Sequence, residues 1–135
     1  MDVSLIVALI GIMAGAAGYW IAMFWMQPIL RYRSIRNRVH SDFIYYAQVV
    51  NADGLNEDMQ KMYRERILAN RKASTELSAA YLELPSWYTW WLEHHKFDPA
   101  KAAQHLIGYS NTREYDQAHK VQAAIRRLLG LPPET

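Results

Sequence analysis

Residues 3–26 form one apolar run, VSLIVALIGIMAGAAGYWIAMFWM, in which no residue is charged and Ser4 is the only strongly polar side chain. At about 1.5 Å of rise per residue, a helix of this length spans roughly 36 Å, which exceeds the roughly 30 Å hydrocarbon core of a bilayer. A helix on the core of a soluble protein normally carries a polar stripe, and this run has none. The sequence therefore predicts a transmembrane helix surrounded by membrane lipid.

The alternative interpretation of this run is a secretory signal peptide. Such a peptide begins with basic residues and ends in a small-residue cleavage site. Here Met1 and Asp2 provide no basic residue, and the small residues AGAAG lie in the middle of the run. The pattern favours an anchor that is not cleaved.

Positive charge gathers on one side of the apolar run. Four arginines follow it before the first acid, Asp42: Arg31, Arg33, Arg36 and Arg38. Basic residues stay on the cytoplasmic side and contact anionic headgroups, so this excess predicts an outside N-terminus and a cytoplasmic C-terminal domain. The aromatic rings that favour the headgroup level gather at the same end: Tyr19, Trp20, Phe24 and Trp25.

The remaining chain is long enough for one compact domain. We divide the sequence into a transmembrane anchor (1–28), a juxtamembrane stalk helix (29–53) and a cytosolic helical domain (54–135) that packs with the stalk. The sequence has no Cys, which excludes disulfides and thiolate-based metal or redox sites. Acids and bases balance in the distal part, so we expect no broad basic face for duplex nucleic acid.

Apolar spacing of three and four residues predicts that the cytosolic part is an all-α bundle. Pro28 should kink or break the chain as it leaves the membrane. Helices are expected over 30–51, from an Asn56 N-cap to about Leu84, from Asp98-Pro99 to about Gly108, and from Asn111 or Thr112 to Gly130.

Small residues share one face of the predicted anchor: Gly11, Gly15, Gly18 and Ala22. Such a face lets two membrane helices approach closely, either two copies of this chain or this chain and another membrane subunit. The simpler interpretation is that Gly and Ala are common in membrane helices.

The segment PSWYTWWLEHH holds three tryptophans within five residues: Trp87, Trp90 and Trp91. These rings either insert into the membrane interface or dock a partner, or they fill the core of the bundle. Because they cannot all face one core, we expect at least one ring to be exposed.

Two polar patches are candidates for ligand contact. One interrupts the apolar stripe of the third predicted helix around Arg71 and Lys72, and the other is a predicted loop at Gly108–Arg113 that opens the last helix. Arginine side chains and helix N-termini both suit anions. If the patches converge, the expected contacts of an anionic ligand are Arg71, Lys72, Ser110, Asn111 and Arg113. The alternative is a solvated helix face beside an ordinary capping loop.

The sequence shows no sign of catalysis. The five His residues are not spaced like metal ligands, and no phosphate-binding loop or nucleophile motif is present. We therefore expect no metal, no cofactor and no enzymatic activity.

Three segments carry a resemblance to a known group of proteins: YAQVVN (46–51), RKASTELSAAYLELP (71–85) and HLIGYSN (105–111). Over most of residues 31–129 the chain resembles uncharacterised bacterial single-pass membrane proteins with small helical cytosolic domains. In architecture it is similar to membrane effectors of type III CRISPR antiviral defence, whose cytosolic domains sense cyclic oligonucleotides. This resemblance implies a location in the bacterial inner membrane and an oligomeric cytosolic domain that signals to the membrane helices.

Two functions are therefore expected. The first is a non-enzymatic membrane sensor or effector that responds to an anionic ligand such as a cyclic nucleotide, or to a protein. The second is a passive accessory subunit that tethers a larger complex to the membrane.

Overall fold

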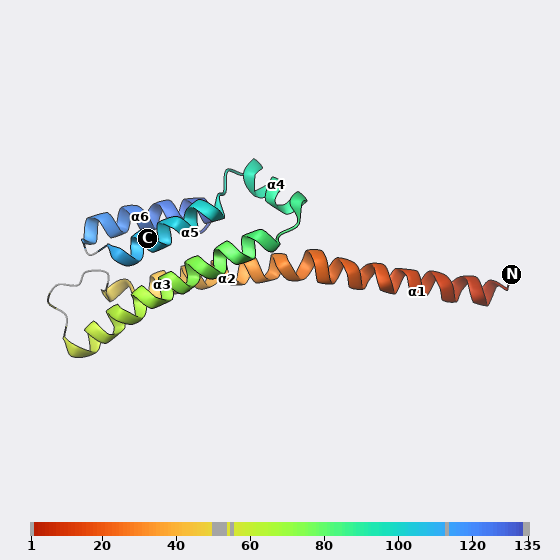
Figure 1. Ribbon diagram of the computed structural model, residues 1–135, viewed down its shortest axis with the longest axis horizontal. Coiled ribbons are helices and arrows are strands. Elements are labelled where there is room, and N and C mark those ends of the chain that lie inside the picture. Colours follow the sequence, from red (N-terminus) through yellow and green to blue (C-terminus); the bar gives the residue numbers. More distant parts are fainter. Residues whose placement is uncertain (1, 50–53, 55, 113, 134–135) are drawn as a thin grey trace.

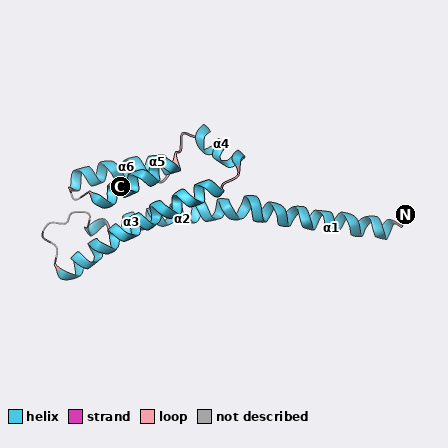
Figure 2. Cartoon of the chain, in the orientation of Figure 1, coloured by secondary structure: helices cyan, strands magenta, loops and turns pink. Residues whose placement is uncertain are grey.

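The computed structural model describes residues 2–49, 54, 56–112 and 114–133, and within them every regular element is helical (Figure 2). This confirms the predicted all-α fold. A long arm, α1, projects from a bundle of helices, and the short α4 lies at the end of the bundle nearest to α1 (Figure 1). The helices are α1 (Val3–Ile21), α2 (Gln27–Tyr45), α3 (Glu57–Glu83), α4 (Ser86–His94), α5 (Pro99–Asn111) and α6 (Tyr115–Leu129).

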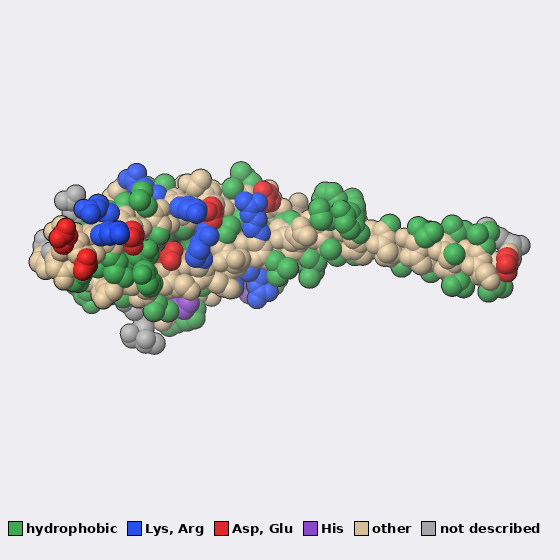
Figure 3. Space-filling model, turned by 90° about the horizontal axis from the view of Figure 1, so that it is seen from below, with side chains coloured by type: hydrophobic (Ala, Val, Ile, Leu, Met, Phe, Trp, Pro, Cys, Tyr) green, Lys and Arg blue, Asp and Glu red, His purple; other side chains and the backbone are tan. Residues whose placement is uncertain are grey.

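The arm α1 continues into α2 as one helix from Val3 to Tyr45, and among the described residues this helix alone is long and apolar enough to cross a membrane. Its N-cap is Asp2, whose carboxylate accepts a hydrogen bond from the Ser4 N–H at 3.3 Å. None of the residues in its most apolar stretch is buried within the chain. Charged side chains cover the bundle, whereas the arm carries almost none beyond its N-terminal tip (Figure 3). We call residues 3–26 the candidate span.

Pro28 does not break this helix. The turn before it, Ala22–Met26, is π-helical, and the N–H of Gln27 bonds to the carbonyl of Ala22, five residues earlier. Because proline has no N–H to donate, a change of hydrogen-bond register at this point lets the helix continue. The predicted interruption is thus a π-helical turn, and the arm runs unbroken into α2.

α2, which lies mostly within the predicted stalk, is a core helix of the bundle. It buries one face, comprising Tyr32, Ile35, Val39 and Phe43. It ends at Tyr45, earlier than predicted, and a short 3₁₀ helix at Ala47–Val49 follows. The helix end expected at Asp53-Gly54 falls on Asp53, which lies outside the described residues.

α3 follows the prediction closely. The Asn56 side chain caps it by accepting a hydrogen bond from the Met59 N–H at 2.9 Å, and the helix ends one residue before Leu84. The polar interruption of its apolar stripe is part of a packed interface, because Asn70 and Ser74 are buried against α5. The Ser74 hydroxyl donates to the carbonyl of Ala103 at 2.6 Å, so its polar group is satisfied inside the bundle.

α5 begins as predicted, with the Asp98 side chain accepting from the Lys101 N–H at 3.1 Å and Pro99 in the first turn. It does not end near Gly108 but continues to Asn111. Burial of Tyr109 and Ser110 stabilises this extra turn and outweighs the low helix propensity of glycine. The segment from Gly108 is therefore the C-terminal end of α5, not a loop that opens α6.

α6 starts at Tyr115, after an N-cap at Glu114, and ends as predicted at Gly130. Gly130 has φ +70°, and the N–H of Leu131 bonds to the carbonyl of Arg126 at 2.8 Å, which closes the helix in a left-handed cap. A Cβ at Gly130 would lie 2.8 Å from the Phe97 ring, so packing adds to the demand for glycine here.

Candidate functional site

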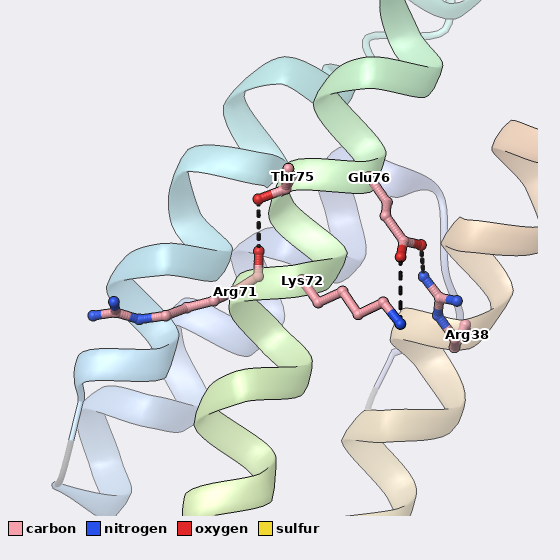
Figure 4. Close-up of polar contacts among 5 residues, drawn as sticks. All are labelled: Arg38, Arg71, Lys72, Thr75 and Glu76. Atoms are coloured by element: carbon pink, nitrogen blue, oxygen red, sulfur yellow. Dashed lines mark hydrogen bonds and ion pairs between the residues drawn. The ribbon is translucent and has the colours of Figure 1, made fainter.

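The two basic residues of the predicted ligand patch on α3 point in different directions (Figure 4). Arg71 extends toward α5, where its Nη2 donates to the side-chain oxygen of Asn111 at 3.0 Å. Lys72 extends toward α2, and its Nζ lies 3.8 Å from the Glu76 carboxylate. Glu76 also forms an ion pair with Arg38 of α2. Adjacent positions on a helix lie roughly 100° apart around its axis, which accounts for the divergence.

The remaining predicted ligand contacts lie at the end of α5. Ser110 is buried, and its hydroxyl donates to the carbonyl of Ile107 at 2.7 Å. Asn111 is exposed and pairs with Arg71, and Arg113 lies outside the described residues. The structure thus brings Arg71 and Asn111 together and separates both from Lys72. The carbonyl end of a helix carries partial negative charge, so this position lacks the attraction for anions that a helix N-terminus would provide.

An open groove of about 530 Å³ lies beside Asn111, between α5 and α6. Its lining combines amide and imidazole side chains with the Glu114 carboxylate: Gln104, His105, Asn111 and Gln117 are among the polar residues. Neither Arg71 nor Lys72 lines it. Among the lining residues that the structure describes, Glu114 is the one acid and none is Lys or Arg.

Glu76 is the residue that joins α3 to α2 electrostatically. Its hydrogen bond to Arg38 and the nearby charges of Arg38, Lys72 and Arg31 hold the pKa of its carboxyl below the usual value of 4.5, against a smaller opposing effect of burial. The side chain is 28% exposed, so solvent screens part of this attraction. The pair ties the helix that continues into the candidate span to the middle of the bundle.

This pKa shift predicts an acid-sensitive contribution to stability. A lowered pKa in the folded state stabilises the fold above the unfolded pKa, and the contribution disappears as the pH falls from about 4.5 through the folded value. We expect the melting temperature of Glu76→Gln to fall less than that of the parent between pH 6 and pH 3. Thermal unfolding followed by circular dichroism in detergent checks this; parallel pH profiles for the two proteins would contradict it.

The four arginines after the candidate span divide into two kinds. Arg31 pairs with Glu83 of α3 at 3.0 Å and Arg38 pairs with Glu76, so both hold α2 against α3. Arg36 contacts its neighbour Asn37 at 3.3 Å, and Arg33 is exposed. Exposed ion pairs contribute on the order of 0–1 kcal/mol each, so these contacts orient the helices more than they stabilise the fold.

A buried arginine that the sequence analysis did not identify lies at the end of α5. Arg66 of α3 has no exposed surface; its guanidinium lies 4.3 Å from the centre of the Tyr109 ring and donates through Nη2 to the Tyr109 carbonyl at 3.2 Å. Its Nε and Nη1 have no hydrogen-bond partner. The signal was available, because Arg66 lies three residues after Tyr63 and four before Asn70, on the apolar stripe of α3.

A second buried arginine, Arg126, joins α6 to α2. Its Nη1 lies 3.0 Å from His40 Nδ1 and donates to the carbonyl of Pro132 at 2.8 Å. Its guanidinium also lies 5.2 Å from the centre of the Phe43 ring. In Arg126, unlike Arg66, contacts with several protein groups replace the lost hydration of the guanidinium, which fits a structural role.

The three tryptophans of α4 remain at the surface. Trp87, Trp90 and Trp91 are 50%, 64% and 40% exposed, which confirms that at least one ring lies outside the core. The other face of α4 provides the core contacts, with Leu92 buried and the Tyr88 ring 6.1 Å from that of Tyr32. α4 thus contributes Tyr88 and Leu92 to the core, whereas its three tryptophans do not fill the core as one interpretation expected.

The small-residue face of the candidate span has no partner within the chain. A Cβ placed at Gly11, Gly15 or Gly18 would meet no atom within 4 Å beyond the helix itself. Ala22, on the same face, begins the π-helical turn. The face is therefore open to another helix or to lipid.

Comparisons with protein-family models, curated proteins and solved structures give no significant match to this chain. In the described part of the chain, no three His, Cys, Asp or Glu side chains gather in a way that suits a metal ion. The function must therefore be inferred from the arrangement of the helices and their surfaces.

Proposed function

We propose that this protein is a non-enzymatic, single-pass accessory subunit that holds its helical domain at the cytoplasmic face of a bacterial inner membrane. The observation that carries the proposal is the unbroken helix from Val3 to Tyr45. Its first part exposes apolar side chains with the single exception of Ser4, and its second part buries Val39 and Phe43 in the core of the bundle. One helix thus serves both as membrane anchor and as core element, so the domain cannot swing freely on a linker.

The charge distribution supports this orientation. The arginines that follow the candidate span lie where the bundle begins, and two of them pair with α3. Arg33 and Arg36 remain at the surface, where they can meet anionic headgroups at about 1 kcal/mol each. The open face around Gly15 would contact another membrane helix, from a second copy of the chain or from a partner subunit.

Labelling of single cysteines tests the anchor and its direction. Because the chain has no Cys, Asp2→Cys and Gln117→Cys each introduce the sole thiol. The reagent is a maleimide that reaches the periplasm but cannot cross the inner membrane. In intact cells it is expected to label position 2, whereas position 117 should react only after lysis. Labelling of position 117 in intact cells would contradict the orientation, and recovery of either variant in the soluble fraction would contradict the anchor.

Arg66 supports a second candidate function, a sensor of anionic ligands like that of the antiviral effectors described above. Two of its nitrogens, Nε and Nη1, are buried without hydrogen-bond partners, and an unsatisfied charged donor is costly. A phosphate group would satisfy one of them, because the two nitrogens face different edges of the guanidinium. A ligand would reach them only if α3 and the end of α5 separate, so that binding would be coupled to a change in the bundle that contains the membrane-anchored helix.

A thermal-shift experiment on the detergent-solubilised chain distinguishes the two candidates. For a sensor, pyrophosphate or a cyclic oligoadenylate is expected to raise the melting temperature of the parent, and Arg66→Met should lose this shift. Arg71→Ala is the matched control, because Arg71 lies at the same end of α5 but already has Asn111 as partner. The absence of any shift in the parent would leave the accessory subunit as the better proposal.

A further inference from the structure

Both faces of α4 are apolar, which is unusual for a short helix at the surface of a protein. Tyr88 and Leu92 face the bundle, whereas Trp87, Trp90 and Trp91 follow the spacing i, i+3 and i+4 on the other side. The acid of this helix, Glu93, lines a separate cavity with Tyr81 and Lys96. Trp90 stacks on His94, and Trp91 lies against His95 and Phe97, yet all three tryptophans stay at least 40% exposed. The outer face of α4 therefore presents aromatic rings that the bundle covers only in part.

The contact between Trp25 and Trp87 fixes the level of this aromatic face. Their ring centres are 6.0 Å apart in an edge-to-face arrangement. Trp25 lies in the last turn of the candidate span, where the apolar run gives way to the arginines. If residues 3–26 cross the membrane, Trp25 lies at the cytoplasmic headgroup level, and Trp87 must lie at the same level. The position of α4 at the end of the bundle nearest to α1 agrees with this (Figure 1).

The chemistry of the face suits a lipid surface. Tryptophan is the side chain most typical of the membrane interface, because its ring is apolar and its indole N–H finds polar partners among the headgroups. The face is also continuous with the apolar surface of the candidate span through the two tryptophans in contact. A protein partner on α4 would have to occupy the same layer as the headgroups.

We propose that α4 is an interfacial helix whose tryptophans lie among the lipid headgroups and upper acyl chains beside the end of the membrane helix. This inference rests on the proposed membrane anchor. The domain then has two attachments to the bilayer, the spanning helix and α4, which together fix how the bundle is rotated and tilted above the surface.

Spin labels on the full-length chain in vesicles of phosphatidylcholine and phosphatidylglycerol test this proposal. Trp90→Cys places a label on the aromatic face, Lys120→Cys places a control label on exposed α6, and Met13→Cys reports on the span itself. Oxygen concentrates in lipid, whereas a nickel chelate stays in water. We expect the ratio of oxygen to nickel accessibility at position 90 to exceed that at position 120 several-fold and to lie below that at position 13, which is nearer the centre of the bilayer.

Each outcome has a separate meaning. If the label at position 90 is accessible from water while the label at position 13 is accessible from lipid, α4 is not an interfacial helix, but the membrane anchor still stands. A label at position 90 that is shielded from both reagents would show that a protein, including a second copy, covers α4, and would also overturn the proposal. Position 13 in water would overturn the anchor itself. Because Trp90 is 64% exposed, its replacement should not disturb the fold, and a second label at Trp87 repeats the test.

Discussion

Val39→Asp is expected to abolish cooperative unfolding of the helical domain while leaving the candidate span able to insert. Val39 is 1% exposed and belongs to the part of the N-terminal helix that the bundle encloses. An unpaired carboxylate at this position costs several kcal/mol, of the order of the about 3–5 kcal/mol lost when a buried ion pair is broken. A domain of this size has a total stability of roughly 5–15 kcal/mol, so the change should remove much of it.

Asn37→Asp is the matched control for Val39→Asp. It introduces the same charge two residues earlier, on the exposed side of the same helix. Circular dichroism in detergent should show a broad or absent melting transition for Val39→Asp and a nearly unchanged one for Asn37→Asp, with both proteins still in the membrane fraction. Equal melting temperatures would contradict the enclosure of α2 by the bundle.

Leu77→Ala is expected to destabilise the domain by about 2–5 kcal/mol, because it leaves a cavity where α3 packs against its neighbours. Leu77 has no exposed surface and belongs to the central hydrophobic cluster. The same substitution at Leu82, which lies on the same helix and is 84% exposed, should change stability by less than about 0.5 kcal/mol.

Chemical denaturation of the two alanine variants and the parent in the same detergent measures both effects. A lower midpoint with an unchanged slope would show a loss of stability without a change in the folded state. A large effect at Leu82 would show that its side chain is covered, by detergent or by a second chain. Similar effects at both positions would contradict the core assignment of α3.

Local signals in the sequence were sufficient for both ends of α3, the start of α5 and the end of α6, but not for the start of α6, which lies at Tyr115 rather than Asn111 or Thr112. Asn56 and Asp98 cap α3 and α5 as expected, and Gly130 closes α6 in a left-handed conformation. Capping depends on side chains within three or four residues, so the sequence contains the necessary information. The apolar spacing also predicted a helix over most of α2, whose buried face includes Ile35, Val39 and Phe43.

Two helix breaks predicted from local residue types, at Gly108 and at Pro28, do not occur. α5 continues through Gly108 because Tyr109 and Ser110 are buried in the bundle. The helix continues through Pro28 because the preceding turn changes its hydrogen-bond register. In both cases a residue that disfavours a helix locally is tolerated because of its surroundings.

The candidate ligand residues show the same limit. Sequence spacing placed Arg71 and Lys72 in one patch, but neighbouring positions on a helix face different partners, and here these are α5 and α2. The expected helix N-terminus beside Ser110 is instead a helix C-terminus, which reverses the sign of its dipole. Arg66 was missed because a basic residue on an apolar stripe is usually exposed, and only the end of α5 encloses it.

The π-helical turn at Ala22–Met26 also sets the angular phase between the two halves of the long helix. A π-helical turn is equivalent to one inserted residue, so it rotates everything N-terminal to it by roughly 100° relative to an ideal α-helix. The turn therefore sets the direction in which the face of Gly11 and Gly15 points, around the helix axis, relative to Trp87 and the bundle. If this turn relaxed to α-helical geometry, the glycine face would rotate about the helix axis and would point in a different direction relative to the bundle.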